Sequence, residues 1–198
     1  FPLIAAGALV AGAFVVSALP SSAETRTYDF KGFTGVSASA GLDVVLRKGP
    51  YSVEVDQESG KFDRLRIEMR GDTLVLGRES TGFWGGRIGR TKVTVTAPGL
   101  ESISVSSGAD VDSRGLEHDV LRIEASSGGR LDIAGSCREL TIDASSGADV
   151  SAAQLRCERV VAQASSGADI EAYATASASG DASSGADIDF AGSPASFT

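Results

Sequence analysis

The residues best suited to chemistry in this chain belong to a repeated motif of two serines, a glycine and an aspartate. "ASSGADV" occupies residues 144–150, and "ASSGADI" occupies 164–170 and 182–188. Looser copies, "VSSGADV" and "ASSGGRL", occupy 105–111 and 125–131. A serine hydroxyl can act as a nucleophile and an aspartate carboxylate can bind a metal ion. The motif therefore raises two kinds of site, which the rest of the sequence must support.

Serine catalysis is the first candidate, and it needs a general base within hydrogen-bonding reach of each serine. The chain contains one histidine, His118, which we place in an exposed turn between repeats. One histidine could serve at most one of the five serine pairs. The motif therefore predicts a structural corner and no catalytic residue. Glycine supplies the backbone angles of a tight turn, and serine hydroxyls can bond to turn amides.

Metal binding by the aspartates is the second candidate. Five aspartates share one register of the motif: Asp43, Asp110, Asp149, Asp169 and Asp187. In stacked repeats they would form a column one strand spacing apart, with Arg130 between Asp110 and Asp149. Asp149, Asp169 and Asp187 follow without a cation, so a metal such as Ca²⁺ would bind there. The nonapeptide of calcium-binding β-rolls does not occur, so we expect no cofactor and keep a calcium-stabilised solenoid as an alternative.

The spacing of the motif defines the elements that carry it. The serine pairs begin at Ser106, Ser126, Ser145, Ser165 and Ser183, at intervals of 20, 19, 20 and 18 residues. Before the corners, "LRIEA" and "LTIDA" alternate apolar and polar residues, as a strand with one buried face does. One such unit cannot bury its own apolar face, but stacked units can, with Leu121 under Leu140 under Val160. We therefore expect an all-β, single-domain parallel β-helix (a right-handed β-solenoid) with coils of about 18–20 residues.

Two segments divide the chain. Residues 1–23 fit a secretory signal peptide, because Leu3–Leu19 is apolar and uncharged and small residues precede an expected cleavage before Glu24. We expect the basic region of this signal to precede Phe1, and an uncleaved anchor is the alternative. Residues 24–198 would then form the solenoid domain of an exported protein in the periplasm, at the cell surface or outside the cell.

The first half of the domain carries the repeat less regularly. "VSASAGLDVVL" (36–46) aligns with the later units, with Gly41 at the corner and Asp43 in the aspartate register. The step Arg70-Gly71-Asp72 is typical of a hairpin turn between two strands. The net charge of −8 would repel a phosphate backbone, so nucleic acid is excluded as a partner.

These features resemble the head-GIN family of putative autotransporter adhesins. The resemblance rests on "FTGVSASAGLDVVLRKG" (33–49), "GFWGG" (82–86), "KVTVTAPGLESISVSSGADV" (92–111) and the serial "SSGAD" corners, and it covers the chain from about Tyr28 to the end. The family's namesake tripeptide falls on Gly41-Leu42-Asp43, where Leu and Asp replace the usual Ile and Asn. The resemblance implies an exported, β-helical bacterial adhesin or envelope scaffold, without established catalytic residues.

Contact surfaces follow from the same pattern. Phe83 and Trp84 are adjacent aromatics in a glycine-rich loop, so they are candidate residues for a surface ligand, glycan or protein; their alternative role is to cap the solenoid. Open solenoid ends leave self-association open as well. An acidic-polysaccharide-binding or -cleaving protein is a further alternative, but no acid–base cluster is evident and all lysines precede residue 93. We therefore expect no enzyme activity.

Cys137 and Cys157 are predicted to form a disulfide bond. They are 20 residues apart, and each lies eight positions before a serine pair, so the repeat stacks them on neighbouring coils. The spacing between neighbouring strands falls within the Cα separations that a disulfide tolerates. Two thiols without histidines make only half of a zinc ligand set. Two free, stacked thiols are the alternative.

Overall fold

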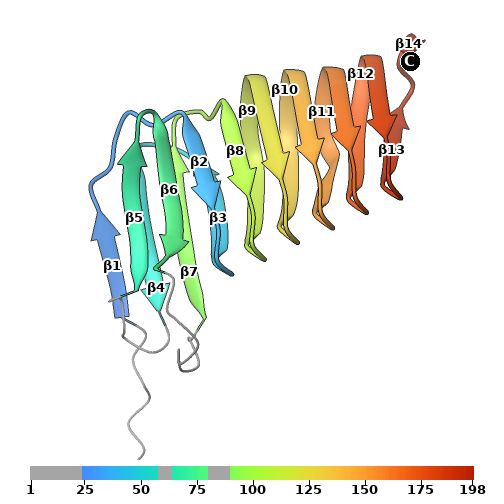
Figure 1. The fold of residues 1–198 in the computed structure, drawn as a ribbon. Helices are drawn as coiled ribbons and strands as arrows, with labels where there is room; N and C mark the ends of the chain where they lie inside the picture. Colours follow the sequence, from blue (N-terminus) through green and yellow to red (C-terminus); the bar gives the residue numbers. More distant parts are fainter. Residues whose placement is uncertain (1–23, 58–63, 80–89) are drawn as a thin grey trace, which may run out of the picture.

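The computed structural model describes residues 24–57, 64–79 and 90–198. The irregular first half contains β1 (Glu24–Tyr28), β2 (Gly35–Ala38), β3 (Asp43–Lys48), β4 (Ser52–Gln57), β5 (Leu65–Arg70), β6 (Thr73–Arg78), β7 (Thr91–Ala97) and β8 (Ser102–Val105). The second half contains β9 (Asp110–Ala125), β10 (Arg130–Ala144), β11 (Asp149–Ala164), β12 (Asp169–Ala182), β13 (Asp187–Gly192) and β14 (Ser196–Phe197). Figure 1 shows the second half as successive coils along one axis. The described residues contain no helix long and apolar enough to cross a membrane.

Parallel pairing between coils confirms the predicted β-solenoid. β9, β10, β11, β12 and β13 follow one another in the sheet, and each pairs in parallel with the next. The inward side chains keep the predicted register, with Leu121 beside Leu140 and Leu140 beside Val160, all at most 1% exposed. The neighbouring inward column consists of Ile123, Ile142, Ala162 and Gly180. The inward side chains of this column therefore become smaller toward the C-terminal coils.

Each long strand covers three faces of its coil. In β9 the alternation of buried and exposed side chains is interrupted at 114–115 and 119–120, where two consecutive side chains lie outside. These two bends and the serine–glycine turn divide the coil. We call 110–113 of β9 the leading face, 116–118 the middle face and 121–125 the trailing face, and use the same names for the equivalent residues of other coils.

The serine–glycine corners depend on two consecutive left-handed residues. The second serine of each pair has φ between 51° and 55°, and the glycine after it between 68° and 76°, in a turn that suits few residues. The amide of Ala109 closes one such turn by donating to the carbonyl of Ser106 at 3.1 Å, and the amide of Gly128 donates to the carbonyl of Ser146 on the next coil at 3.2 Å. The corner is thus joined by backbone groups, where we had expected a contribution from the hydroxyls.

The first half begins the solenoid and then departs from it. β2 pairs in parallel with β6 and β8, and β3 pairs in parallel with β7 and β9, so Asp43 lies beside Asp110 as predicted. β5 and β6 form the expected antiparallel hairpin, with Gly71 at a φ of 63°. β1, β4 and β7 also pair antiparallel, which the repeat did not predict. In the first half of the domain, the parallel pairing between coils therefore gives way to antiparallel pairs: β5 with β6, and β4 with β1 and β7.

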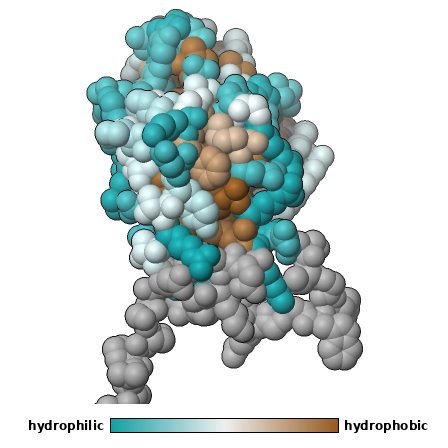
Figure 2. All heavy atoms as spheres, turned by 90° about the vertical axis from the view of Figure 1, so that its left-hand side faces the viewer, coloured by the Kyte–Doolittle hydropathy of each residue, from teal (hydrophilic) through white to brown (hydrophobic). Residues whose placement is uncertain are grey.

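The two ends of the core are covered by larger side chains. At the N-terminal end, half-buried side chains pack on the core: Tyr28, Phe30, Tyr51, Leu65, Ile67 and Met69. Figure 2 views this end and shows apolar atoms at its centre, bordered by hydrophilic ones. At the other end, the rings of Phe190 and Phe197 meet edge to face at 5.6 Å, and Phe190 occupies the space beside Gly180. Phe197 itself is 66% exposed, so this end is only partly covered.

Two glycines should respond very differently to alanine. A methyl group on Gly147 would meet nothing within 4 Å, so Gly147→Ala should cost only the strain of a left-handed alanine, roughly 1–2 kcal/mol. A methyl group on Gly135 would overlap the backbone carbonyl of Leu116, which cannot rotate away. Gly135→Ala should therefore lower the free energy of unfolding by at least twice as much, measured by urea denaturation. Equal losses of stability would contradict this difference in the space around the two glycines.

Candidate functional site

The predicted column of aspartates lies on the leading face. Its residues in order along the sheet are Asp43, Asp110, Arg130, Asp149, Asp169 and Asp187. Nε of Arg130 lies 3.4 Å from a carboxylate oxygen of Asp149. The expectation that Asp149 lacks a neighbouring cation is therefore wrong, because the side chain of Arg130 extends toward the later coil. Asp169 and Asp187 are exposed and have no cationic partner in the described part of the chain.

The column provides no preformed metal site. Across residues 24–57, 64–79 and 90–198, no three side chains of His, Cys, Asp or Glu lie close enough together to hold an ion. Calcium binds through six to eight oxygen atoms, which a single row of exposed carboxylates does not supply. Calcium binding by Asp149, Asp169 and Asp187 stays a prediction. Phe83 and Trp84 lie outside the described residues, and their contact role stays a prediction too.

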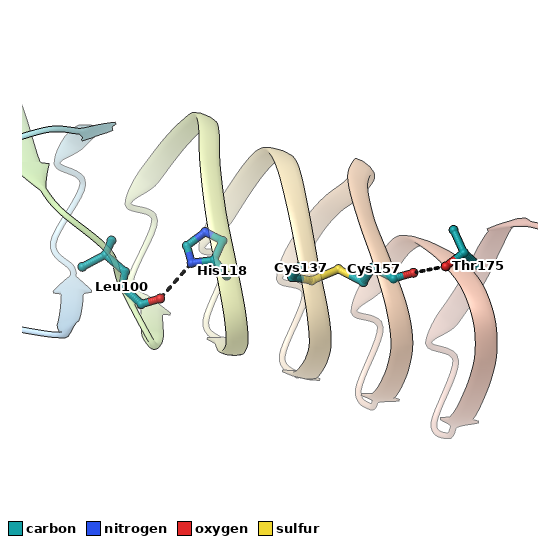
Figure 3. The surroundings of a disulfide bond; sticks show 5 residues. All are labelled: Leu100, His118, Cys137, Cys157 and Thr175. Carbon is teal, nitrogen blue, oxygen red and sulfur yellow. Dashed lines mark hydrogen bonds between the residues drawn. A yellow bond between two sulfur atoms is a disulfide. The ribbon is translucent and has the colours of Figure 1, made fainter.

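His118 is buried, and its expected place in an exposed turn is wrong. It lies within β9 on the middle face and is 8% exposed. Its Nδ1 lies 2.8 Å from the carbonyl oxygen of Leu100, so Nδ1 carries the proton and donates it (Figure 3). Its Nε2 is buried without a hydrogen-bond partner. The alternation of the "LEHDV" segment, with Leu116 and His118 both inward, was the signal for burial that a reading of the segment as a turn missed.

Burial governs the protonation of this ring. Desolvation lowers the pKa of His118 below its ordinary value of 6.5, the hydrogen bond to Leu100 acts in the opposite direction, and the charge of Lys48 lowers the pKa further. His118 neighbours Cys137 in the ladder and makes no hydrogen bond to a serine. The arrangement is that of an interior histidine.

The predicted disulfide joins Cys137 and Cys157 on neighbouring coils. Their Cα atoms are 4.5 Å apart, and their side chains are 8% and 1% exposed. Figure 3 shows His118, Cys137 and Cys157 in a row along the axis, and Ala174 continues the column on the next coil. The Thr175 hydroxyl donates to the carbonyl of Cys157 at 3.1 Å. The bond therefore lies in the wall of the core, where it ties two coils together.

Exposed ion pairs connect the earlier coils, and they end before the last ones. Arg138 bonds to Asp119 with Nε at 2.7 Å, and Arg159 pairs with Glu139 across the next interval. Both arginines lower the pKa of the Glu139 carboxyl, Arg159 most strongly through its hydrogen bond. From residue 160 onward the chain has no lysine or arginine, and its charged residues are Asp169, Glu171, Asp181, Asp187 and Asp189. Five of the eight net negative charges therefore lie on the C-terminal coils.

A regular, mostly polar surface occupies the trailing faces and the adjoining serine corners of three coils. Its outward side chains are Thr141, Asp143 and Ser145 on the β10 coil, Val161, Gln163 and Ser165 on the β11 coil, and Ser179, Asp181 and Ser183 on the β12 coil. We call this set the polar array. A shallow hollow of about 330 Å³ runs across it between the Asp143 row and the Ser145 row. The sequence pattern placed these residues outward, and the hollow lies where the ends of the trailing faces meet the serine corners.

The family of the chain follows from comparison with known proteins. A family model described as "Putative auto-transporter adhesin, head GIN domain" matches residues 32–194. The chain belongs to the head-GIN family. The resemblance seen in the corner motifs is thereby confirmed over most of the chain. No curated protein matches this head-GIN chain in sequence.

Solved structures share the head-GIN fold. A putative adhesin from Bacteroides fragilis superimposes with a TM-score of 0.73 at 23% identity, covering 90% of this chain and 93% of that one. A putative adhesin from Parabacteroides merdae superimposes with a TM-score of 0.53 at 11% identity, covering 88% and 95%. Identities this low establish a common fold and no more.

Reduction should destabilise the protein through this one bond. The disulfide closes a loop of 20 residues, which stabilises by roughly 3 kcal/mol on the chain-entropy model. A reductant should therefore lower the free energy of unfolding of the wild type by about that amount, measured by urea denaturation. The double variant Cys137→Ala/Cys157→Ala is the control, because it should not respond to reductant. A wild type indifferent to reductant would contradict the stabilising role.

His118 should make stability depend on pH. The unfolded chain binds a proton near pH 6.5, whereas the folded chain resists it because protonated Nε2 would be a buried donor without a partner. The contribution of neutral His118 to the free energy of unfolding is therefore fully present above its unfolded pKa of 6.5. It should decrease as the pH falls from there toward the lower pKa of the folded state. Thermal melts between pH 7.5 and 5.5 should show this slope in the wild type and a shallower one in His118→Gln. Equal slopes in both proteins would exclude His118 as the cause.

Proposed function

We propose that this protein is an exported, non-catalytic β-solenoid that acts as an adhesin at the bacterial surface or in the cell envelope. The match of residues 32–194 to a family described as an autotransporter adhesin carries this proposal. The solved structures with the same fold are described as putative adhesins, which agrees with it. A signal peptide at residues 1–23 would deliver the protein to that location.

The physical character of the fold suits this role. Strand pairing between coils and a disulfide in the wall give a stiff body that does not depend on its outward side chains. A disulfide of this kind persists in the oxidising conditions outside the cytoplasm. The outward columns are free to vary and can present repeated groups to a ligand. Catalysis is not favoured, because no hydrogen bond among the described residues joins a corner serine to a histidine, and the one histidine of the chain is buried in the column of the disulfide.

Adhesion can be measured with the purified domain. Beads coated with residues 24–198 should adhere to surfaces carrying the protein's ligand, a glycan or a matrix protein, and should leave soluble glycans intact. Beads coated with an unrelated protein of similar negative charge provide the control. A screen over matrix proteins and immobilised glycans with no adhesion above that control, or cleavage of a glycan by the pure domain, would overturn the proposal.

The aromatic pair allows a second comparison in the same screen. If Phe83 and Trp84 form the contact, the double variant Phe83→Ala/Trp84→Ala should lose adhesion while its thermal stability stays close to that of the wild type. Unchanged adhesion would move the contact onto the faces of the solenoid. A large fall in the melting temperature would assign the pair to the structure of the domain.

A further inference from the structure

The polar array carries an inference about the kind of ligand. We propose that it binds a neutral oligosaccharide segment laid across the β10, β11 and β12 coils. The inference rests on the proposed adhesive function and names the ligand class and the site for it.

The hollow gives the array a defined place for a ligand. One side is formed by Asp143, Gln163 and Asp181 and the other by Ser145, Ser165 and Ser183, with buried alanines beneath. Equivalent groups on neighbouring coils lie about 4.8 Å apart, so the three coils span roughly 10 Å. The hollow therefore offers the same pair of polar groups at each coil, which suits a polymer with a short, uniform repeat.

The side chains of the hollow have unused hydrogen-bonding capacity. Among the described residues, the side chains of Gln163, Asp181 and the three serines form no hydrogen bond or ion pair, whereas Asp143 accepts from Arg122 at 2.7 Å. Serine hydroxyls donate and accept, the Gln163 amide does both, and the carboxylates accept. Sugar hydroxyls need this mixture, because each of them is both a donor and an acceptor.

An exposed apolar side chain completes the match. Val161 is 45% exposed in the outward row next to Gln163, between Thr141 and Ser179 in the ladder. A single exposed valine is common on protein surfaces and indicates no ligand by itself, so Val161 contributes to the inference only through its position beside the polar row. A sugar ring has an apolar C–H face and a polar hydroxyl rim. Val161 could cover the former while the groove binds the latter.

Charge selects among polar ligands. Asp143 and Asp181 lie on the groove, and the coils from residue 160 onward carry five acids and no base, so uronate or sulfate groups would be repelled. A cationic peptide would be attracted, but Asp143 is already paired with Arg122, and four of the six groove side chains are uncharged. A neutral sugar chain therefore fits the groove better than either charged ligand.

Matched variants test the inference. Calorimetric titration of residues 24–198 against neutral oligosaccharides of hexoses and N-acetylhexosamines should show saturable binding. Gln163→Ala should weaken binding by about tenfold, because one well-made hydrogen bond is lost. Val161→Ala should also weaken it, because an apolar contact with the sugar ring is lost. The controls are Gln154→Ala and Val120→Ala, which change exposed residues of the same types outside the groove and should bind as the wild type does.

Three results would overturn the inference: no binding of the neutral panel, groove variants that bind as tightly as their controls, or tighter binding of oligogalacturonate or of a lysine peptide. Melting temperatures of all four variants should stay within a few degrees of the wild type, because each site is exposed. The bead assay separates the two proposals. If the beads adhere to a matrix protein but the domain binds no sugar, this inference alone is overturned. If the wild-type beads adhere to no surface above the control, the adhesin proposal is overturned.

Discussion

The structure depends on backbone hydrogen bonds that join each coil to the next through the corner as well as along the strands. Gly128 donates to Ser146 and Gly147 donates to Ser166, so even the turns belong to the ladder. Such continuity requires each corner to repeat the same backbone path. That path includes two left-handed residues, which accounts for a glycine preceded by a small residue at every corner, including Ala40 and Gly41 in the first coil. The repeated motif is therefore a consequence of backbone geometry rather than of serine chemistry.

Stacking also determines how the molecule must end. A parallel ladder leaves unpaired strand edges, which other chains can join unless something discourages them. At the N-terminal end, antiparallel pairs replace the parallel ladder and half-buried aromatic and aliphatic side chains pack over the core. At the C-terminal end the inward residues of the trailing face are only alanine and glycine, such as Ala178 and Gly180, Phe190 packs beside Gly180, and the last strands carry Asp187 and Asp189. Like charges along an open edge disfavour the approach of a second acidic edge.

The sequence was most informative where one interaction repeats. The period predicted the parallel coils, the inward columns, the aspartate register and the stacking of Cys137 on Cys157, because all of these follow from adding one coil length. The period did not predict features that depend on a single side chain or on the ends of the solenoid. His118 was misplaced because a short polar segment looks like a turn unless its alternation is followed. The period places Arg130 between two aspartates, but its pairing with Asp149 is not encoded in it, and neither are the antiparallel strands β1 and β4 or the groove.

The solenoid is stabilised by its inward residues and its backbone pairing, and not by its outward side chains. Its outward side chains can therefore serve recognition without loss of stability. Inward leucine and isoleucine side chains, the ladder and the disulfide stabilise the coils, whereas exposed ion pairs such as Arg138–Asp119 contribute little, roughly 0–1 kcal/mol each. Outward residues are therefore under weak structural constraint. Along β9 and β10 they are nevertheless matched, acid against base. Beyond Arg159 the matching stops, and the surface becomes acidic and rich in hydroxyl groups. Because the fold does not require that composition, a contact made by these coils is the physical reason we assign to it.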